Sequence, residues 1–181
     1  MPIENKEDDN KRTKGIFREF LIYILIVVVA VISAVLIRVF ILEPFIVPTP
    51  SMEPNLKVGD KVIVNKLAYK LGNIERGDIV AFHSPMEEKD LVKRAVGVEG
   101  DEITLTAEGE IFINGEKNIE NYLPSGQNIS YLNQTVIVGK NEIFVMGDNR
   151  NNSFDSRFFG TISEEDVFGK FLVIYWPPSR W

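Results

Sequence analysis

The sequence predicts a mainly β protein, in which an antiparallel, sandwich- or barrel-like β domain follows one N-terminal transmembrane helix. Two observations lead to this fold class. An uncharged apolar run near the N-terminus is long enough to cross a bilayer. Beyond it, short runs of β-branched residues alternate with Gly, Pro, Asn and Asp, which is typical of a domain built from short strands and turns.

The apolar run extends from Phe20 to Ile37, and 18 residues of helix measure about 27 Å, close to the thickness of the hydrocarbon core. Arg38 can reach the interface if the helix continues to Leu42. A buried core helix would be less uniformly apolar. A cleavable signal peptide would have a shorter apolar region, promptly followed by a pair of small residues. We therefore expect an uncleaved anchor over residues 19–42.

Basic residues are concentrated before this span, which predicts its orientation. After the span only Lys57 and Lys61 come as close as the basic residues that precede it. We expect a disordered cytoplasmic tail over residues 1–18 and an extracytoplasmic β domain over residues 43–181, in a single-pass protein of the cell membrane. The basic residues before the span are Lys6, Lys11, Arg12, Lys14 and Arg18.

Within the β domain, Gly-Asp followed by branched apolar residues occurs at Gly59-Asp60, Gly77-Asp78 and Gly100-Asp101. Gly-Asp favours a turn, and the irregular spacing favours successive turns of a meander over a true repeat. Residues 118–133 are polar and predict a surface loop, and Ser163-Glu164-Glu165-Asp166 predicts a helical turn. Further strands are expected at residues 91–98, 110–114, 135–138, 142–146 and 170–176.

Composition excludes several kinds of site. The chain has no Cys and one His, so thiolate and multi-His metal sites are excluded, and we expect neither a metal nor a cofactor. A net charge of -6 argues against nucleic acid as a partner, because such binding needs a basic face.

Ser51 lies between two prolines, in Pro50-Ser51-Met52-Glu53-Pro54, shortly after the anchor. A serine becomes nucleophilic when a base takes its proton. The lone His83 is one candidate for that base. Lys93 is the other, because strand alternation places it on one face with Leu91 and Ala95, and burial favours a neutral amine.

A third segment, residues 147–157, is dense in turn formers and hydrogen-bonding side chains. The segment is either a solvated loop or a packed network of hydrogen bonds that supports a site. Packed polar groups must be paired. We therefore expect Asp148, Asp155, Arg150 and Arg157 to pair with one another.

Together these motifs resemble bacterial type I signal peptidases (leader peptidases), in the compact single-span form. The resemblance implies a membrane-anchored serine endopeptidase that uses a Ser-Lys dyad and cleaves signal peptides from exported preproteins, after small residues at the -1 and -3 positions. Its partners would be these preproteins and the lipid bilayer. The motifs are Pro50 to Leu56, Gly77 to Phe82, Val92 to Gly97, and Gly147 to Arg150 continued by Asp155 to Arg157.

The resemblance also implies roles for single residues. Ser51 would be the nucleophile, Lys93 the general base, and Ser153 would orient the Lys93 amine. Thr49 would assist the Ser51 N–H in the oxyanion hole, since Pro50 has no N–H to donate. Salt bridges that support the site would come from Asp155 and Arg157, with Asp148 and Arg94.

An extended substrate would add beside an exposed strand edge, and shallow apolar pockets would select small side chains. We expect these pockets to be lined by Phe45, Ile46, Val47, Val80, Ala81 and Phe82. Two alternatives stay open. One is a self-cleaving Ser-Lys regulator, which would need a DNA-binding helix pair in place of the anchor. The other is a non-enzymatic, membrane-anchored β domain.

Overall fold

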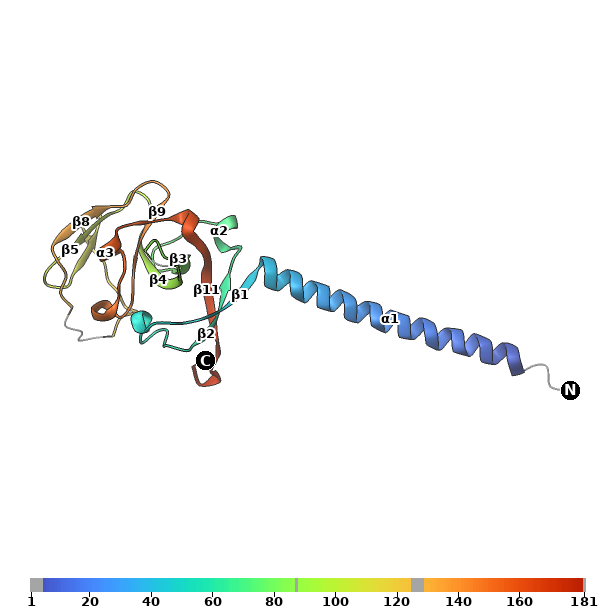
Figure 1. Cartoon of the computed structure of the whole chain (residues 1–181). Coiled ribbons are helices and arrows are strands. Elements are labelled where there is room, and N and C mark those ends of the chain that lie inside the picture. Colours follow the sequence, from blue (N-terminus) through green and yellow to red (C-terminus); the bar gives the residue numbers. More distant parts are fainter. Residues whose placement is uncertain (1–4, 87, 125–128, 181) are drawn as a thin grey trace. The chain divides into compact units, whose positions relative to one another are not determined.

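The structure, a computed structural model, describes residues 5–86, 88–124 and 129–180 (Figure 1). It divides into two compact units, Met1–Ile41 and Leu42–Trp181. The first unit holds one long helix and the second holds two antiparallel sheets. The prediction of a mainly β domain after one apolar helix is therefore confirmed.

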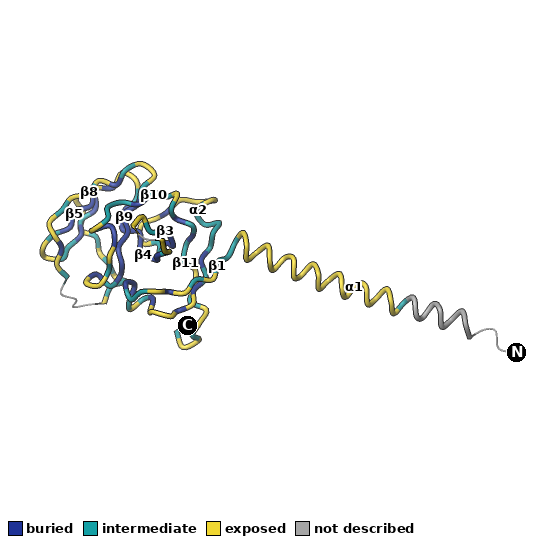
Figure 2. Tube along the Cα trace, viewed as in Figure 1, coloured by how far each residue is buried: buried dark blue, intermediate teal, exposed yellow. Residues whose placement is uncertain are grey.

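Helix α1 runs from Asn5 to Phe40, and its segment Gly15–Phe40 has the length and mean hydropathy, 3.3, of a membrane span. Apolar side chains surround this segment between Phe20 and Ile37, and every residue from Ile16 to Phe40 is exposed (Figure 2). Residues 5–18 belong to this helix, in place of the disordered tail that we predicted, and residues 1–4 lie outside the described residues. Lys, Glu and Arg in this stretch are good helix formers, and they continue a helix that the apolar run already nucleates.

The larger sheet has seven strands in the order β1-β2-β11-β3-β4-β9-β10, and the smaller has four in the order β7-β6-β5-β8. The larger sheet curls into a half-barrel (Figure 1). Its strands are β1 (Leu42–Ile46), β2 (Lys61–Asn65), β3 (Ile79–His83), β4 (Asp90–Gly97), β9 (Glu142–Met146), β10 (Ile162–Ser163) and β11 (Val167–Trp176). The smaller sheet comprises β5 (Glu102–Leu105), β6 (Ile111–Ile113), β7 (Glu116–Lys117) and β8 (Gln134–Ile137).

Short helices connect the strands. The helical turn predicted at Ser163–Asp166 is confirmed as the 3₁₀ helix η3, whose N–H of Glu165 donates to the Ser163 hydroxyl. The other short helices are α2 (Ala68–Leu71), α3 (Ser156–Phe159), and the 3₁₀ helices η1 (Pro50–Met52), η2 (Arg150–Asn152), η3 (Glu164–Asp166) and η4 (Pro178–Arg180).

The three Gly-Asp pairs form one kind of turn before strands β2, β3 and β5. Each glycine has a positive φ, between 84° and 93°, a conformation that favours glycine. Each following aspartate accepts the N–H of the residue three positions earlier, as at Asp101, whose Oδ2 lies 2.9 Å from the Val98 nitrogen. The turns are therefore of one local kind, but the predicted meander is wrong, because β11 lies between β2 and β3 and β5 belongs to the smaller sheet.

Candidate active site

Ser51 lies in the short helix η1 and is only 5% exposed. Pro50 occupies the first helical position, where a missing N–H costs nothing. Met52 and Leu56 anchor the turn in a core cluster with Val62 and Val64. The Ser51 and Thr49 side-chain oxygens share a hydrogen bond of 3.0 Å. The sequence therefore builds a rigid turn that presents Ser51 with a second hydroxyl beside it.

Lys93 lies on β4, directly opposite Val80 of β3. Leu91 and Ala95 belong to the same core cluster as Val80, which confirms the predicted face of the strand. The lysine residue is 2% exposed. Burial lowers the pKa of the Lys93 amine to about 8, while Asp155 acts in the opposite direction. About one tenth of this amine is therefore neutral at pH 7 and half of it at pH 8, and the neutral form is the one that a general base requires.

One cavity of about 250 Å³ brings Ser51, Lys93 and Thr49 together. Among the described residues, the Ser51 hydroxyl bonds Thr49 and makes no direct hydrogen bond to Lys93. The cavity has an apolar side formed by Leu91 and Phe154, neither of which the sequence singled out as a site residue. Its remaining lining residues are Pro50, Ser84, Lys89 and Asn152.

Both salt bridges that the resemblance implied are present. Arg94 donates two bonds to the fully buried Asp148, at 2.8 and 2.7 Å, and a third to the Gly77 carbonyl. Arg157 donates to both oxygens of the equally buried Asp155, at 2.7 and 2.8 Å. Paired, bidentate guanidinium groups make a rigid frame. How far this frame supports catalysis stays a prediction.

We expected Arg150 to pair with Asp148 or Asp155, but the structure gives it a different partner. Its guanidinium donates two bonds of 2.5 Å to Glu120, which lies in the stretch predicted to be a surface loop. It also donates to the Tyr131 hydroxyl at 2.9 Å. Residues 118–124 and 129–133 thus include partners of a buried arginine. Sequence patterns could not reveal this, because the partners are far apart in the chain and no local period links them.

Two asparagines join the turn that carries Ser51 to residues 147–157, and the sequence reasoning missed both. The Asn149 N–H donates to the Ser51 carbonyl at 2.9 Å, and its side-chain amide donates to the Pro50 carbonyl at 3.1 Å. The Asn55 amide donates to Asp148 at 2.7 Å. The sequence offered one signal for their role: Asn55 lies in the motif Pro50 to Leu56, and Asn149 lies in the motif Gly147 to Arg150.

Gly147 lies where these segments meet. A Cβ at this position would be 2.2 Å from Ser153 Oγ and 2.4 Å from the Ser51 carbonyl oxygen, so no side chain fits. Its N–H donates to Asp155 at 2.9 Å. The Ser153 hydroxyl is buried and has no hydrogen-bond partner among the described residues. Its expected role of orienting Lys93 therefore stays a prediction.

None of the six residues expected to select the substrate lines this cavity. Val80 and Phe82 belong to one buried core cluster, and Val47 and Ala81 to another. Phe45 is partly buried against the second cluster, while Ile46 is 58% exposed. From the sequence these residues are apolar positions of strands. Period-2 alternation separates the two faces of a strand, but it does not identify the face that lines the cavity.

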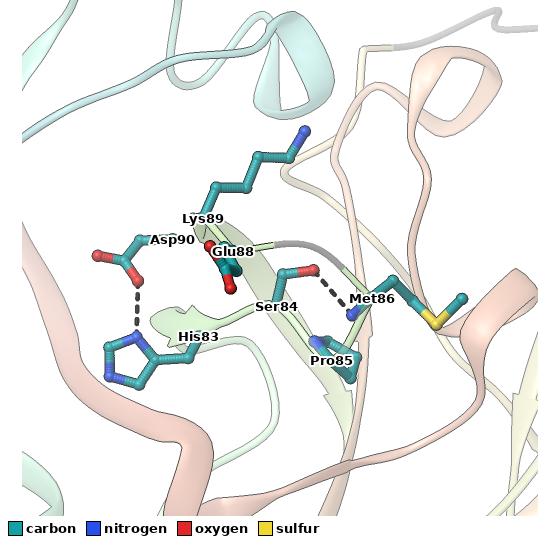
Figure 3. Close-up of a pocket in the computed structure, with 7 residues that line it drawn as sticks. All are labelled: His83, Ser84, Pro85, Met86, Glu88, Lys89 and Asp90. Carbon is teal, nitrogen blue, oxygen red and sulfur yellow. Dashed lines mark hydrogen bonds and ion pairs between the residues drawn. The ribbon is translucent and has the colours of Figure 1, made fainter.

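His83 lies apart from this chemistry. Its ring nitrogen Nδ1 is 2.6 Å from Asp90, its side chain is 64% exposed, and its ring packs on Phe168. Figure 3 shows the His83 ring and Asp90 facing each other in a second cavity of about 490 Å³. No hydrogen bond among the described residues joins His83 to Ser51. The structure therefore offers no support for a Ser-His triad.

Comparisons with known proteins give a consistent result. Residues 20–176 match the model of the family described as signal peptidase, peptidase S26. A probable signal peptidase I-2 of Synechocystis sp. is 37% identical over 159 residues, which cover 84% of this chain and 72% of the relative. Signal peptidase IB of Staphylococcus aureus is 34% identical over 181 residues, which cover 90% of this chain and 93% of the relative.

Among solved structures, a signal peptidase I from Enterococcus faecalis V583 matches with a TM-score of 0.49 and 29% identity. The match covers 56% of this chain and 98% of that chain.

Proposed function

The chain belongs to the signal peptidase family, peptidase S26, and we propose that it cleaves signal peptides with Ser51 as nucleophile and Lys93 as general base. The family makes the chain a serine peptidase and excludes the non-enzymatic alternative. One observation carries the assignment of the dyad: Ser51 and Lys93 line the same cavity, and burial lowers the pKa of this lysine to about 8.

The reaction follows from these two groups. The neutral Lys93 amine takes the Ser51 proton as Oγ attacks the scissile carbonyl carbon. The oxyanion that forms accepts hydrogen bonds from the Ser51 N–H and the Thr49 hydroxyl. The C–N bond then breaks, and the protonated Lys93 gives its proton to the leaving amine. Water, activated by Lys93, hydrolyses the remaining ester and restores the Ser51 hydroxyl.

The register of β4 supports an extended mode of substrate binding. This strand pairs with β9 only from Arg94 onward, so along Asp90–Lys93 the edge on that side has no strand partner within the described residues. A substrate segment before the cleaved bond can add there as a strand, with its backbone bonded to β4. Its last residue would then reach Ser51.

Selection of small residues at positions -1 and -3 belongs to the same proposal. Leu91 and Phe154 give the cavity apolar walls, and we expect the position of these two side chains, more than the volume of about 250 Å³, to limit the size of a substrate side chain. Of the six residues expected to contact substrate, Ile46 is exposed and Phe45 is partly buried, and we keep that role for these two. The buried four, Val47, Val80, Ala81 and Phe82, support the strands beneath.

We extend the proposal to location. The apolar helix forms a single-pass anchor over residues 19–42, with the N-terminal tail in the cytoplasm and the β domain outside. Its partners are preproteins in the same bilayer. Tethering enzyme and substrate to one membrane raises their effective concentration.

Cleavage of a signal-peptide-bearing preprotein by the full chain in detergent micelles tests the dyad. Ser51→Ala and Lys93→Ala should each lower kcat by about 10³-fold or more, because nucleophile and base act as one unit. The exposed Ser179 and Lys61 give matched controls, and Ser179→Ala and Lys61→Ala should cleave normally. Near-normal turnover by Lys93→Ala would refute the dyad.

A further inference from the structure

Glu120, which lies outside the motifs that carry the family resemblance, forms a buried ion pair with Arg150 of the fourth motif. Its two carboxylate oxygens each accept a bond of 2.5 Å from Arg150. The Arg150 side chain is 0% exposed and the Glu120 side chain 11%. Two tyrosine hydroxyls complete the cluster, since Tyr131 accepts from Arg150 at 2.9 Å and Tyr122 donates to Glu120.

Arg150 connects this cluster to the nucleophile. Its Nε donates to the Gly147 carbonyl at 3.0 Å. Gly147 in turn packs against the Ser51 carbonyl so closely that no Cβ fits between them. The Asn149 N–H holds that same carbonyl at 2.9 Å. The guanidinium therefore sets the path of the backbone on which Ser51 rests.

The neighbouring Tyr122 reaches two other segments of the site. Its ring lies 3.9 Å beneath the guanidinium carbon of Arg94, the residue next to Lys93. Its carbonyl accepts from the Asn55 amide at 3.0 Å, in the segment that carries Ser51. Residues 120–122 thus contact all three segments that bring Ser51, Lys93 and residues 147–157 together.

We propose that Glu120 is a positioning residue of the active site, acting through Arg150 on the Gly147 backbone that supports Ser51. This inference rests on the proposed role of Ser51 as nucleophile. Glu120 does not line the cavity, so it affects the reacting groups and not substrate contacts. Loss of its charge would leave a buried guanidinium without a counter-charge, free to seek Asp148 or Asp155 and to release the Gly147 carbonyl.

Kinetics of preprotein cleavage by the full chain test this role. Glu120→Gln should lower kcat by about 10- to 100-fold with KM within about twofold, because misplacing a reacting group by 1 Å has an effect of this size. Glu120→Asp keeps the charge and should restore most of the loss. Glu110→Gln is the matched control, since Glu110 forms an exposed pair with Lys117, and it should leave kcat and KM unchanged.

A double variant separates positioning from mere stability. Glu120→Gln with Arg150→Met removes both buried charges, and such replacements are often neutral or stabilising, so Tm should recover. The kcat should stay low, because Met cannot hold the Gly147 carbonyl. Joint recovery of Tm and kcat would show that the pair is only structural and would overturn the proposal.

The single variants distinguish failure of this inference from failure of the proposed function. If Ser51→Ala is inactive while Glu120→Gln keeps a kcat within about twofold of the unchanged chain, this inference fails and the proposed function stands. If Ser51→Ala itself cleaves the preprotein, the proposed function fails first, whatever Glu120→Gln does.

Discussion

Lys93 shows how the position of one side chain in a sheet lowers the pKa of its amine. It lies opposite Val80, between Leu91 and Ala95 on the same face, where hydration of a charged amine is lost. It lines the cavity that it shares with Ser51 and Thr49. The same burial that lowers the pKa of the amine therefore works against stability, and each effect can be measured.

The first prediction at this scale concerns pH. The proposed mechanism needs the neutral Lys93 amine, and burial lowers the pKa of this amine to about 8. We expect kcat/KM to rise about tenfold per pH unit below that value and to level off above it. Initial rates between pH 6 and 9.5 measure this, with Lys61→Ala as a control that should show the same profile. A flat profile across this range would contradict Lys93 as the base.

The second prediction concerns stability. The unfolded chain holds the Lys93 proton up to its ordinary pKa of 10.5, but the folded chain releases it near 8, so protonation favours unfolding. Lys93→Met should raise the free energy of unfolding by about 3 kcal/mol below pH 8. This gain should vanish as pH rises through 10.5. Urea unfolding of the full chain in detergent at pH 7 and pH 10.5 checks it, and an equal gain at both would contradict it.

At the scale of elements, the turns and the segment 147–157 behave differently. The turns at Gly59, Gly77 and Gly100 are set locally, by a positive φ and an aspartate that bonds the backbone three residues earlier. Residues 147–157 are instead held by distant partners, Arg94 among them. Local elements can be predicted from short patterns, whereas this segment depends on how the sheet is assembled.

Gly147→Ala tests that dependence. The added Cβ would meet the Ser51 carbonyl oxygen at 2.4 Å, and backbone cannot yield as a flexible side chain does. Overpacking of this kind costs about 1–3 kcal/mol, and here the strain falls on the turn that carries Ser51, so kcat should drop by about 100-fold. Gly72→Ala is the control, because its nearest contact is an ordinary 3.4 Å. Equal preprotein cleavage by both variants would refute the close approach.

At the scale of the whole molecule, the two units differ in what they contain. Leu42–Trp181 has its own core of three apolar clusters and carries the cavity with Ser51 and Lys93. The unit Met1–Ile41 contributes a helix with the composition of a membrane span. We therefore expect chemistry to reside in one unit and access to membrane-bound substrate in the other.

Removal of residues 1–41 should separate these contributions. Cleavage of a short soluble peptide should stay within about threefold of the full chain, because the reacting groups remain in place. Cleavage of a preprotein reconstituted in the same vesicles should fall by about 100-fold or more, because effective concentration is lost. Parallel assays with the two substrates measure this, and an equal loss on both would show that the β domain needs the helix.

The sequence by itself determined the parts that depend on local patterns. An apolar run long enough for a bilayer, Gly-Asp turns before branched strands, and alternation around Lys93 each depend on neighbouring residues. They therefore predicted the anchor, the mainly β fold and the face on which Lys93 lies. The salt bridges of Arg94 and Arg157 followed from the family resemblance.

Tertiary structure alone decided which distant groups meet. Period-2 alternation could not show that Val80 and Phe82 lie in the core, that Leu91 and Phe154 wall the cavity, or that Glu120 pairs with Arg150. Such contacts arise when the sheet curls and buried charges find counter-charges far along the chain. Burial makes unpaired groups so unfavourable that pairing is required, but only the assembled sheet selects the partner.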